Sequence, residues 1–204
     1  MTGVSYYLSL NSPWSYLGSG RLIEMTRRLG VTVDVKPARY GEVFAQTGGL
    51  PVAKRPPARR AYRMMELSRW REHLAIPIVL EPRHFPSDET AGTRLVIAAA
   101  RAGQDALTLS REIGRALWER EESIADPAVL AAAAARAGVD IDAVRATAPS
   151  EAALDAIWDA NTAEAVSRGV FGAPSYVLAS GEIFWGQDRL DFLERALQRE
   201  SGGS

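Results

Sequence analysis

The sequence predicts an α/β protein whose two ends fold together around a helical insertion. Strand, helix and strand patterns follow one another in the first part of the chain, and strand, strand and helix patterns follow one another at its end. Between them, almost every periodic segment repeats its apolar residues at helical spacing. We therefore expect residues 1–40 and 168–200 to share one four-stranded mixed sheet with helices on both faces, and residues 41–167 to form a linker and an all-helical insertion.

The N-terminal part is expected to be a βαβ unit with a right-handed crossover. Residues 4–10 (VSYYLSL) are short and β-rich, as strands are. Pro13 fits the first turn of a helix, where its missing N–H leaves no bond unmade, and the apolar spacing continues to Gly30, a favoured helix end. Residues 31–35 (VTVDV) alternate as a second strand and stop before Pro37.

The middle of the chain is expected to be a loop followed by helices. Residues 41–58 are rich in glycine and proline, which predicts a loop. The segments after it repeat apolar residues at helical spacing, and several of them begin or end at favoured boundary residues. Their expected ranges are 59–73, 87–102, 108–120, 126–138 and 150–167.

The end of the chain returns to strand patterns. Pro174 precedes a strand at 175–179 (SYVLA), a tight turn at Ser180-Gly181 joins it to a strand at 182–185 (EIFW), and an amphipathic helix follows over 187–198. This order of elements is the thioredoxin architecture with a helical domain placed in its middle.

Composition narrows the class of protein. The 204 residues are 47% hydrophobic and 24% charged with a net charge of −1, so no overall field attracts nucleic acid or an anionic membrane. The N-terminus lacks the basic start and cleavage site of a signal peptide, and no apolar run approaches the ~18 residues that span a bilayer. We expect a cytoplasmic protein with no nucleic-acid or membrane partner, ending in a disordered tail, ESGGS.

Cysteine and histidine are scarce. The chain has no cysteine and two histidines, His73 and His84. Disulfides, thiolate metal sites and cysteine nucleophiles are therefore excluded, and no metal site is expected. The G-x-S-x-G motif of serine hydrolases is also absent. Any thiol that this protein uses must come from a ligand.

The loop after the first strand, SLNSPWSYLG from Ser9, combines two serines with a helix start. Ser12 and Ser15 flank Pro13 and Trp14 in the spacing at which a redox dithiol would have cysteines. A helix N-terminus offers unpaired N–H groups and the positive end of the dipole, which suit an anion or a thiolate. Ser12 either only caps the helix or donates its hydroxyl to such a ligand, whereas Ser15 is expected to be structural.

Three further segments each have a functional and a structural interpretation. Pro174 is either a cis proline opposite the first loop, with Ala173 offering its backbone to a peptide-like ligand, or an ordinary trans turn proline. Gln187 and Asp188 either grip an α-amino acid end or compensate a helix dipole. The basic stretch KRPPARRAYR from Lys54 is either a solvated helix face or a set of guanidinium groups for ligand carboxylates.

Four segments together resemble a known family. They occur in the same order in 2-hydroxychromene-2-carboxylate isomerases and in the similar kappa-class glutathione transferases, and the resemblance covers essentially the whole chain. The resemblance implies a thioredoxin-like domain with a helical insertion, a homodimer, a glutathione site and kinship with the periplasmic disulfide oxidoreductases. The segments are SPWSYLG from Ser12, REHLAIPI from Arg71 followed by Phe85, GVFGAPS from Gly169 and FWGQDRL from Phe184.

The resemblance also implies roles for single residues. Ser12 matches the family's catalytic serine, which holds the glutathione sulfur as a thiolate, and Trp14 is expected to face the second substrate. Ala173, next to a cis Pro174, matches the residue that pairs with the cysteinyl backbone of glutathione. Gln187 and Asp188, with Arg189 beside them, match the pair that binds the γ-glutamyl end. One basic residue of the insertion is expected to contact glutathione; Arg60 matches it best, and Lys54 is the alternative.

The expected function is glutathione-dependent isomerisation of 2-hydroxychromene-2-carboxylate-type intermediates of aromatic degradation. A kappa-like glutathione transferase acting on other electrophiles would share the activated thiolate, so it stays open as an alternative. A non-catalytic thioredoxin-like protein that binds another thiol or a peptide is the second alternative, because relatives often have asparagine where this chain reads TGGL from Thr47.

Overall fold

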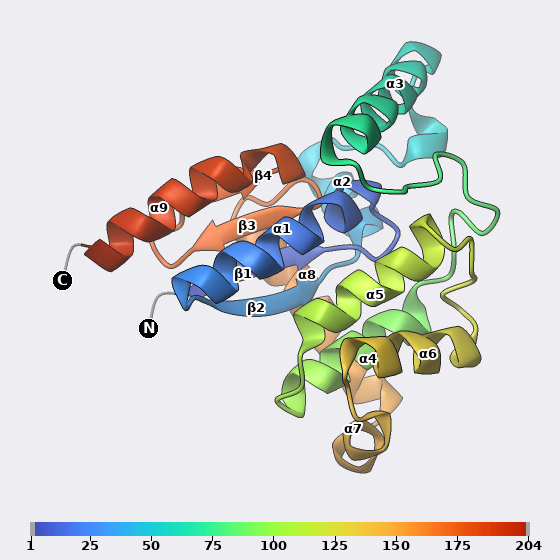
Figure 1. Ribbon diagram of the computed structural model, residues 1–204, viewed down its shortest axis with the longest axis vertical. Helices are drawn as coiled ribbons and strands as arrows, with labels where there is room; N and C mark the ends of the chain where they lie inside the picture. Colours follow the sequence, from blue (N-terminus) through green and yellow to red (C-terminus); the bar gives the residue numbers. More distant parts are fainter. Residues whose placement is uncertain (1–2, 203–204) are drawn as a thin grey trace.

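The computed structural model describes residues 3–202 and confirms the predicted α/β architecture (Figure 1). Two short 3₁₀ helices, η1 and η2, lie at Val52–Lys54 and Gln187–Arg189. The strands are β1 (Gly3–Leu8), β2 (Thr32–Pro37), β3 (Ser175–Leu178) and β4 (Ile183–Trp185). The α-helices are α1 (Pro13–Leu29), α2 (Tyr40–Thr47), α3 (Pro57–Leu74), α4 (Thr90–Arg101), α5 (Ala106–Trp118), α6 (Pro127–Ala137), α7 (Ile141–Thr147), α8 (Glu151–Ser167) and α9 (Leu190–Gly202).

The four strands form one mixed sheet in the order β2-β1-β3-β4, which confirms that the two ends of the chain pair. β1 runs parallel to β2 and antiparallel to β3, and β4 runs antiparallel to β3. In this register Tyr6 lies opposite Val35 on one side and Tyr176 on the other. The Tyr6 and Tyr176 rings stack with centroids 5.3 Å apart, so the two ends of the chain are also joined through their side chains.

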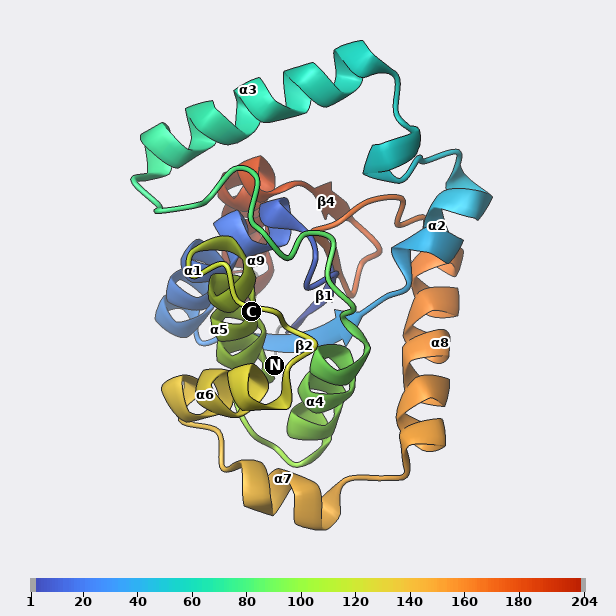
Figure 2. The same cartoon turned by 90° about the vertical axis from the view of Figure 1, so that its right-hand side faces the viewer.

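Helices cover both faces of the sheet, as the sequence predicted. Because side chains alternate along a strand, Tyr6 belongs to the main core, which also includes buried residues of α1, α5 and α9. Tyr7 belongs to a second cluster on the opposite face, together with Tyr40 and Val43 of α2 and Ala165 of α8. Figure 2 shows α1 and α8 on opposite sides of β1 and β2. Two helices from the middle of the chain, α2 and α8, therefore cover the second face of the sheet.

Of the remaining helices of this region, α5 packs on α1 and α6 packs on α5, whereas α4 packs against α5, α8 and β2, and α7 packs on α4. α5 lies along α1 and against α6, and close approach is possible because Gly114 has no side chain: a Cβ there would come within 3.3 Å of the Tyr16 ring. No helix within residues 3–202 is both long and apolar enough to cross a membrane.

Two expectations about local structure are wrong, and one helix was not predicted. The segment 41–58 is not only loop, because α2 forms where Tyr40 and Val43 are buried, and it ends at Gly48 in the left-handed conformation. A short helix, α7, also forms between the predicted fifth and sixth helices. α9 runs beyond the predicted end into the tail that we expected to be disordered, whose last two residues, 203–204, lie outside the described part.

α3 stands over one end of the sheet rather than in the main body. Figure 2 shows it crossing above α1 and β4, joined to the rest by extended segments at both ends. Of its 18 residues only Arg63 and Leu67 are buried. The space beneath α3 contains the residues of interest for function.

Candidate active site

A cavity of about 560 Å³ lies between α3 and the end of the sheet where β3 begins and β4 ends. Five residues that the sequence analysis placed near a ligand line it together, although they come from three separate parts of the chain: Trp14, Ala173, Gln187, Asp188 and Arg189. The other lining residues are Arg55, Ala58, Arg59, Tyr62, Arg63, Glu66, Trp70, Trp185 and Gly186.

Ser12 caps α1 and is not itself among the residues that line this cavity, but it contacts one of them. Its Oγ accepts a hydrogen bond from the N–H of Ser15 at 3.1 Å. The same hydroxyl donates a longer hydrogen bond of 3.4 Å to the carbonyl of Ala173, which lines the cavity. Because the cap uses a lone pair and not the proton, the two roles considered for Ser12 are compatible.

The first turn of α1 leaves one backbone donor free. Pro13 has no N–H, and the N–H groups of Ser15 and Tyr16 donate to the Oγ and the carbonyl of Ser12. Within residues 3–202, the N–H of Trp14 donates no such bond. A negatively charged atom beside Ser12 would therefore meet one amide, one hydroxyl and the positive end of a helix of 17 residues.

The partly buried carboxylate of Glu89, the residue before α4, fixes the loop before Ser12. Glu89 accepts hydrogen bonds from the Ser9 hydroxyl, at 2.9 and 3.1 Å, and from the N–H of Asn11 at 3.0 Å. The Asn11 amide exchanges two hydrogen bonds, of 2.8 and 2.9 Å, with the backbone of Ser87. Burial raises the pKa of Glu89, and these hydrogen bonds oppose the rise. The roles of Asn11 and Glu89 could not be predicted from the sequence, because nothing local shows that the start of α4 meets this loop.

The segment opposite Ser12 has the geometry that the resemblance implied. The Ala173–Pro174 peptide bond is cis. The N–H of Ala173 donates no hydrogen bond to another described residue, so it is available to a ligand. Next to it, Gly172 allows the exposed Trp185 to approach, since a Cβ at this glycine would lie 2.3 Å from the indole nitrogen.

Gln187 is held inward by an arginine that the sequence analysis did not single out. Gln187 is 2% exposed, and the Arg21 guanidinium donates to its backbone carbonyl at 2.7 Å and to its side-chain oxygen. The Gln187 Nε2 is buried without a partner in the described structure. Asp188 forms a 3.0 Å ion pair with the neighbouring Arg189. Arg21 lies about two turns into α1, and only the tertiary fold brings it to Gln187.

The two basic residues expected to contact a ligand lie outside the cavity lining. Lys54 and Arg60 are exposed, whereas Arg55, Arg59 and Arg63 line the cavity. The cause is the helical period: residues 59, 62, 63, 66 and 70 share one face of α3, and Arg60 is turned about 100° from Arg59. The spacing of Arg59, Arg63, Glu66 and Trp70 was the available signal, but the sequence does not show which face of α3 meets the sheet.

Comparison with known proteins decides the family. The chain matches the DSBA-like thioredoxin domain over residues 3–198. The chain belongs to this family. It is 30% identical over 196 residues to the 2-hydroxychromene-2-carboxylate isomerase of Sphingobium xenophagum, covering 95% of this chain and 97% of that protein. It is 26% identical to glutathione S-transferase kappa 1 of Homo sapiens, covering 95% and 90%.

A solved structure of a 2-hydroxychromene-2-carboxylate isomerase agrees with this DSBA-like chain at a TM-score of 0.76 and 27% identity, covering 98% of this chain and 96% of that one. The thioredoxin-like fold and the resemblance to isomerases and kappa-class transferases are therefore confirmed. This DSBA-like protein is an enzyme of the isomerase or transferase type. The roles expected for its individual site residues stay predictions.

Proposed function

We propose that this protein is a glutathione-dependent isomerase of 2-hydroxychromene-2-carboxylate-type intermediates. The names of its relatives support the reaction class. The observation that best supports the site is the Ser12 hydroxyl, whose oxygen is fixed by the cap while its proton points to the carbonyl of Ala173 at the cavity edge. We further propose that the enzyme is a cytoplasmic homodimer.

The residues around the cavity fit glutathione. The chain has no cysteine, so the reactive sulfur must be brought by a ligand, and glutathione would supply a thiolate nucleophile. The free N–H of Ala173 beside cis-Pro174 suits the backbone of a short peptide. Gln187 and Asp188 suit the carboxylate and ammonium of a γ-glutamyl end. Arg59 on the inner face of α3 takes the place expected for Arg60 or Lys54 as a cationic contact at the cavity.

The chain's own groups act on the thiol and on the second substrate. The Ser12 hydroxyl and the Trp14 N–H donate to a negatively charged sulfur, and the α1 dipole adds to their effect, so all three lower the pKa of a thiol held there. Trp14, Tyr62, Trp70 and Trp185 supply ring faces for a planar substrate. The hydrogen bonds that Ser9 and Asn11 donate to Glu89 keep Ser12 in place.

Replacing Ser12 tests the proposal. Ser12→Ala should lower glutathione-dependent turnover by about 10²-fold, the scale of losing one preorganised donor. Because alanine also removes a helix cap, Ser12→Asp is the companion variant: it keeps a capping oxygen but offers no proton and repels a thiolate. Ser15→Ala is the matched control, since its buried hydroxyl has no partner in the described structure. Turnover of Ser12→Ala equal to that of the unmodified enzyme would refute the role of Ser12.

A kappa-like transferase is the second candidate, because a kappa-class enzyme is among the curated relatives. Mass spectrometry of the products separates the two reactions. An isomerase returns glutathione unchanged, whereas a transferase leaves it joined to the product. A thermal shift with millimolar glutathione tests the ligand itself, and no shift would indicate a different thiol.

A further inference from the structure

Arg63 is a buried cation without a counter-ion. The residue is 8% exposed, and its Nη2 is buried without a hydrogen-bond partner. Its Nη1 meets only the sulfur of Met64 at 3.7 Å, and its Cζ lies 5.5 Å from the centre of the Phe85 ring. No carboxylate within residues 3–202 forms an ion pair with it. A buried charge left in this state is costly, so a native structure that keeps one calls for an explanation.

The surroundings of Arg63 add positive charge instead of neutralising it. Arg55 lines the same cavity, and among residues 3–202 its guanidinium donates to the carbonyl of Leu50 alone, at 2.8 Å. Burial lowers the pKa of Arg63, and the charge of Arg55 lowers it further. Burial and the charge of Arg59 lower the pKa of Arg55 in the same way. In the free protein, burial and mutual repulsion both destabilise these two positive charges. A bound anion would stabilise them.

The two carboxylates that line the cavity are already engaged. Glu66 forms a 2.5 Å ion pair with the exposed Arg69, which holds the pKa of this carboxyl below its ordinary value. Asp188 is paired with Arg189. Neither carboxylate neutralises Arg55 or Arg63, so the charge of these two arginines is available to a molecule from outside.

We propose that Arg63 and Arg55 form an anion subsite in the cavity wall that takes the carboxylate of an aromatic acid. A guanidinium binds a planar carboxylate through two parallel hydrogen bonds, and Trp14, Tyr62 and Trp70 line the same space for an aromatic ring. The subsite rests on the proposed function in one respect: the carboxylate belongs either to the electrophilic substrate or to the glycine end of glutathione.

Matched probes test the subsite. Calorimetry with trans-cinnamate and with trans-cinnamamide, which has the same shape and no charge, reads carboxylate recognition directly and without glutathione. The unmodified protein should bind cinnamate at least about tenfold more tightly than cinnamamide. Arg63→Met should remove this preference, Arg63→Lys should retain part of it, and Arg71→Met, on the same helix but outside the cavity lining, should leave it unchanged.

Titration of glutathione and of its glycine ethyl ester distinguishes the two sources. If the substrate supplies the carboxylate, Arg63→Met leaves glutathione binding unchanged, and cinnamate binds together with glutathione. If glutathione supplies it, Arg63→Met and the ester both weaken glutathione binding, and cinnamate competes. The proposal is overturned if Arg63→Met binds cinnamate and glutathione as the unmodified protein does. A protein that prefers cinnamate but never binds glutathione would keep the subsite and refute the proposed function.

Discussion

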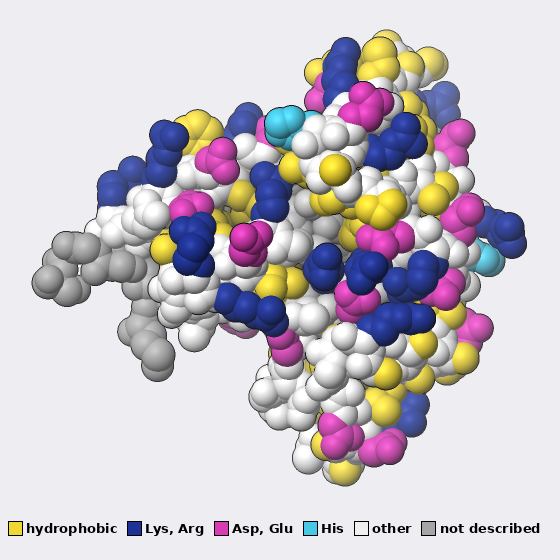
Figure 3. Space-filling model, viewed as in Figure 1, with side chains coloured by type: hydrophobic (Ala, Val, Ile, Leu, Met, Phe, Trp, Pro, Cys, Tyr) yellow, Lys and Arg dark blue, Asp and Glu magenta, His cyan; other side chains and the backbone are white. Residues whose placement is uncertain are grey.

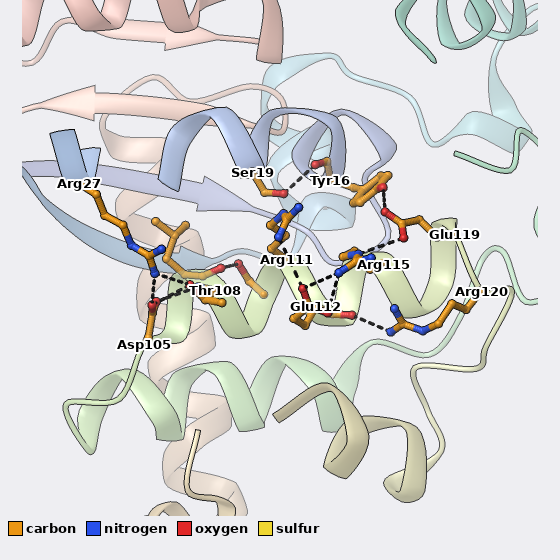
Figure 4. A network of polar contacts seen from close by, with 12 residues as sticks. Tyr16, Ser19, Arg27, Asp105, Thr108, Arg111, Glu112, Arg115, Glu119 and Arg120 are labelled. Atoms are coloured by element: carbon orange, nitrogen blue, oxygen red, sulfur yellow. Dashed lines mark hydrogen bonds and ion pairs between the residues drawn. The ribbon is translucent and has the colours of Figure 1, made fainter. Parts of the chain in front are cut away.

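Two arginine-rich regions of this molecule differ in whether their positive charges are paired with carboxylates. Each arginine labelled in Figure 4, in and around α5, is paired with a carboxylate. Arg27 pairs with Asp105, Arg111 with Glu112, and Arg115 with Glu112 and Glu119; Arg120 pairs with Glu122, which the figure does not label. Figure 3 shows Lys or Arg and Asp or Glu side chains next to one another over this part of the surface. Around the cavity under α3, Arg55 and Arg63 form no ion pair with any described residue.

The contrast separates arginines whose charge is balanced by a carboxylate of the protein from arginines that have no such partner. In the first region the Tyr16 hydroxyl donates to Glu119, and the bond joins α1 to α5. Burial and this carboxylate raise the pKa of Tyr16, so the phenol keeps its proton. In the second region, by contrast, the Nη2 of Arg63 is left without a hydrogen-bond partner in the described structure. Substitutions should therefore affect stability in one region and binding in the other.

Glu112→Ala should give the largest loss of stability. The Glu112 side chain is 5% exposed and lies between Arg111, at 3.6 Å, and Arg115, at 3.1 Å. Its removal leaves two cations facing each other, which should cost about 2 kcal/mol of unfolding free energy; this is below the range for fully buried pairs, because both arginines are partly exposed. Urea unfolding measures it. A loss under about 0.5 kcal/mol would contradict a stabilising role for Glu112 between the two arginines of α5.

Arg63→Met should change stability in the opposite direction. The variant removes an uncompensated buried charge and keeps a side chain of similar length, so the free protein should gain about 1 kcal/mol. The measurement is urea unfolding without ligand, with Arg71→Met as the control for loss of a cation from α3. A clear loss of stability would show that Arg63 is needed for packing and would weaken the contrast between the regions.

Arg27→Met should have the smallest effect. The Arg27–Asp105 pair, at 3.0 Å, is exposed, with side-chain exposures of 67% and 44%, so its loss should cost less than about 0.5 kcal/mol at pH 7. Burial raises the pKa of Asp105, but hydrogen bonds from Thr108 and Arg27 outweigh this and lower it. The contribution is therefore complete above the ordinary value of 3.8 and is lost as pH falls through the lower folded value.

Unfolding of Arg27→Met and of the unmodified protein should consequently converge in acid. Urea curves at pH 7 and near pH 2.5 make the comparison. A difference that grows as the pH is lowered would contradict the assignment of this pair.

The sequence predicts the elements whose boundaries are set locally. Ser12 and Gly30 delimit α1, and Asp126 and Gly138 delimit α6, as their cap preferences indicate. α2 could not be predicted in the same way, because it depends on burial of Tyr40 and Val43 against a distant helix.

Some residues of the candidate site could likewise be predicted from local sequence, and others could not. Ser12, Ala173 and Gln187 lie in short motifs that the sequence displays. Arg63 and Glu89 reach the site only because of where α3 and α4 pack in the fold, which the local sequence does not show. The periodicity of α3 groups Arg59 with Arg63, but only the packing of α3 over the sheet tells this face from the one that presents Arg60.

β1 lies between β2 and β3 in the sheet, although β3 is made almost at the end of the chain. During translation, β1 and β2 leave the ribosome with all the helices from α2 to α8 still to follow, so one edge of β1 has no partner for most of synthesis. An open strand edge is a template for pairing with another chain, and such distant pairing slows folding. A chain cut short before Ser175 therefore exposes the β1 edge and is prone to aggregate.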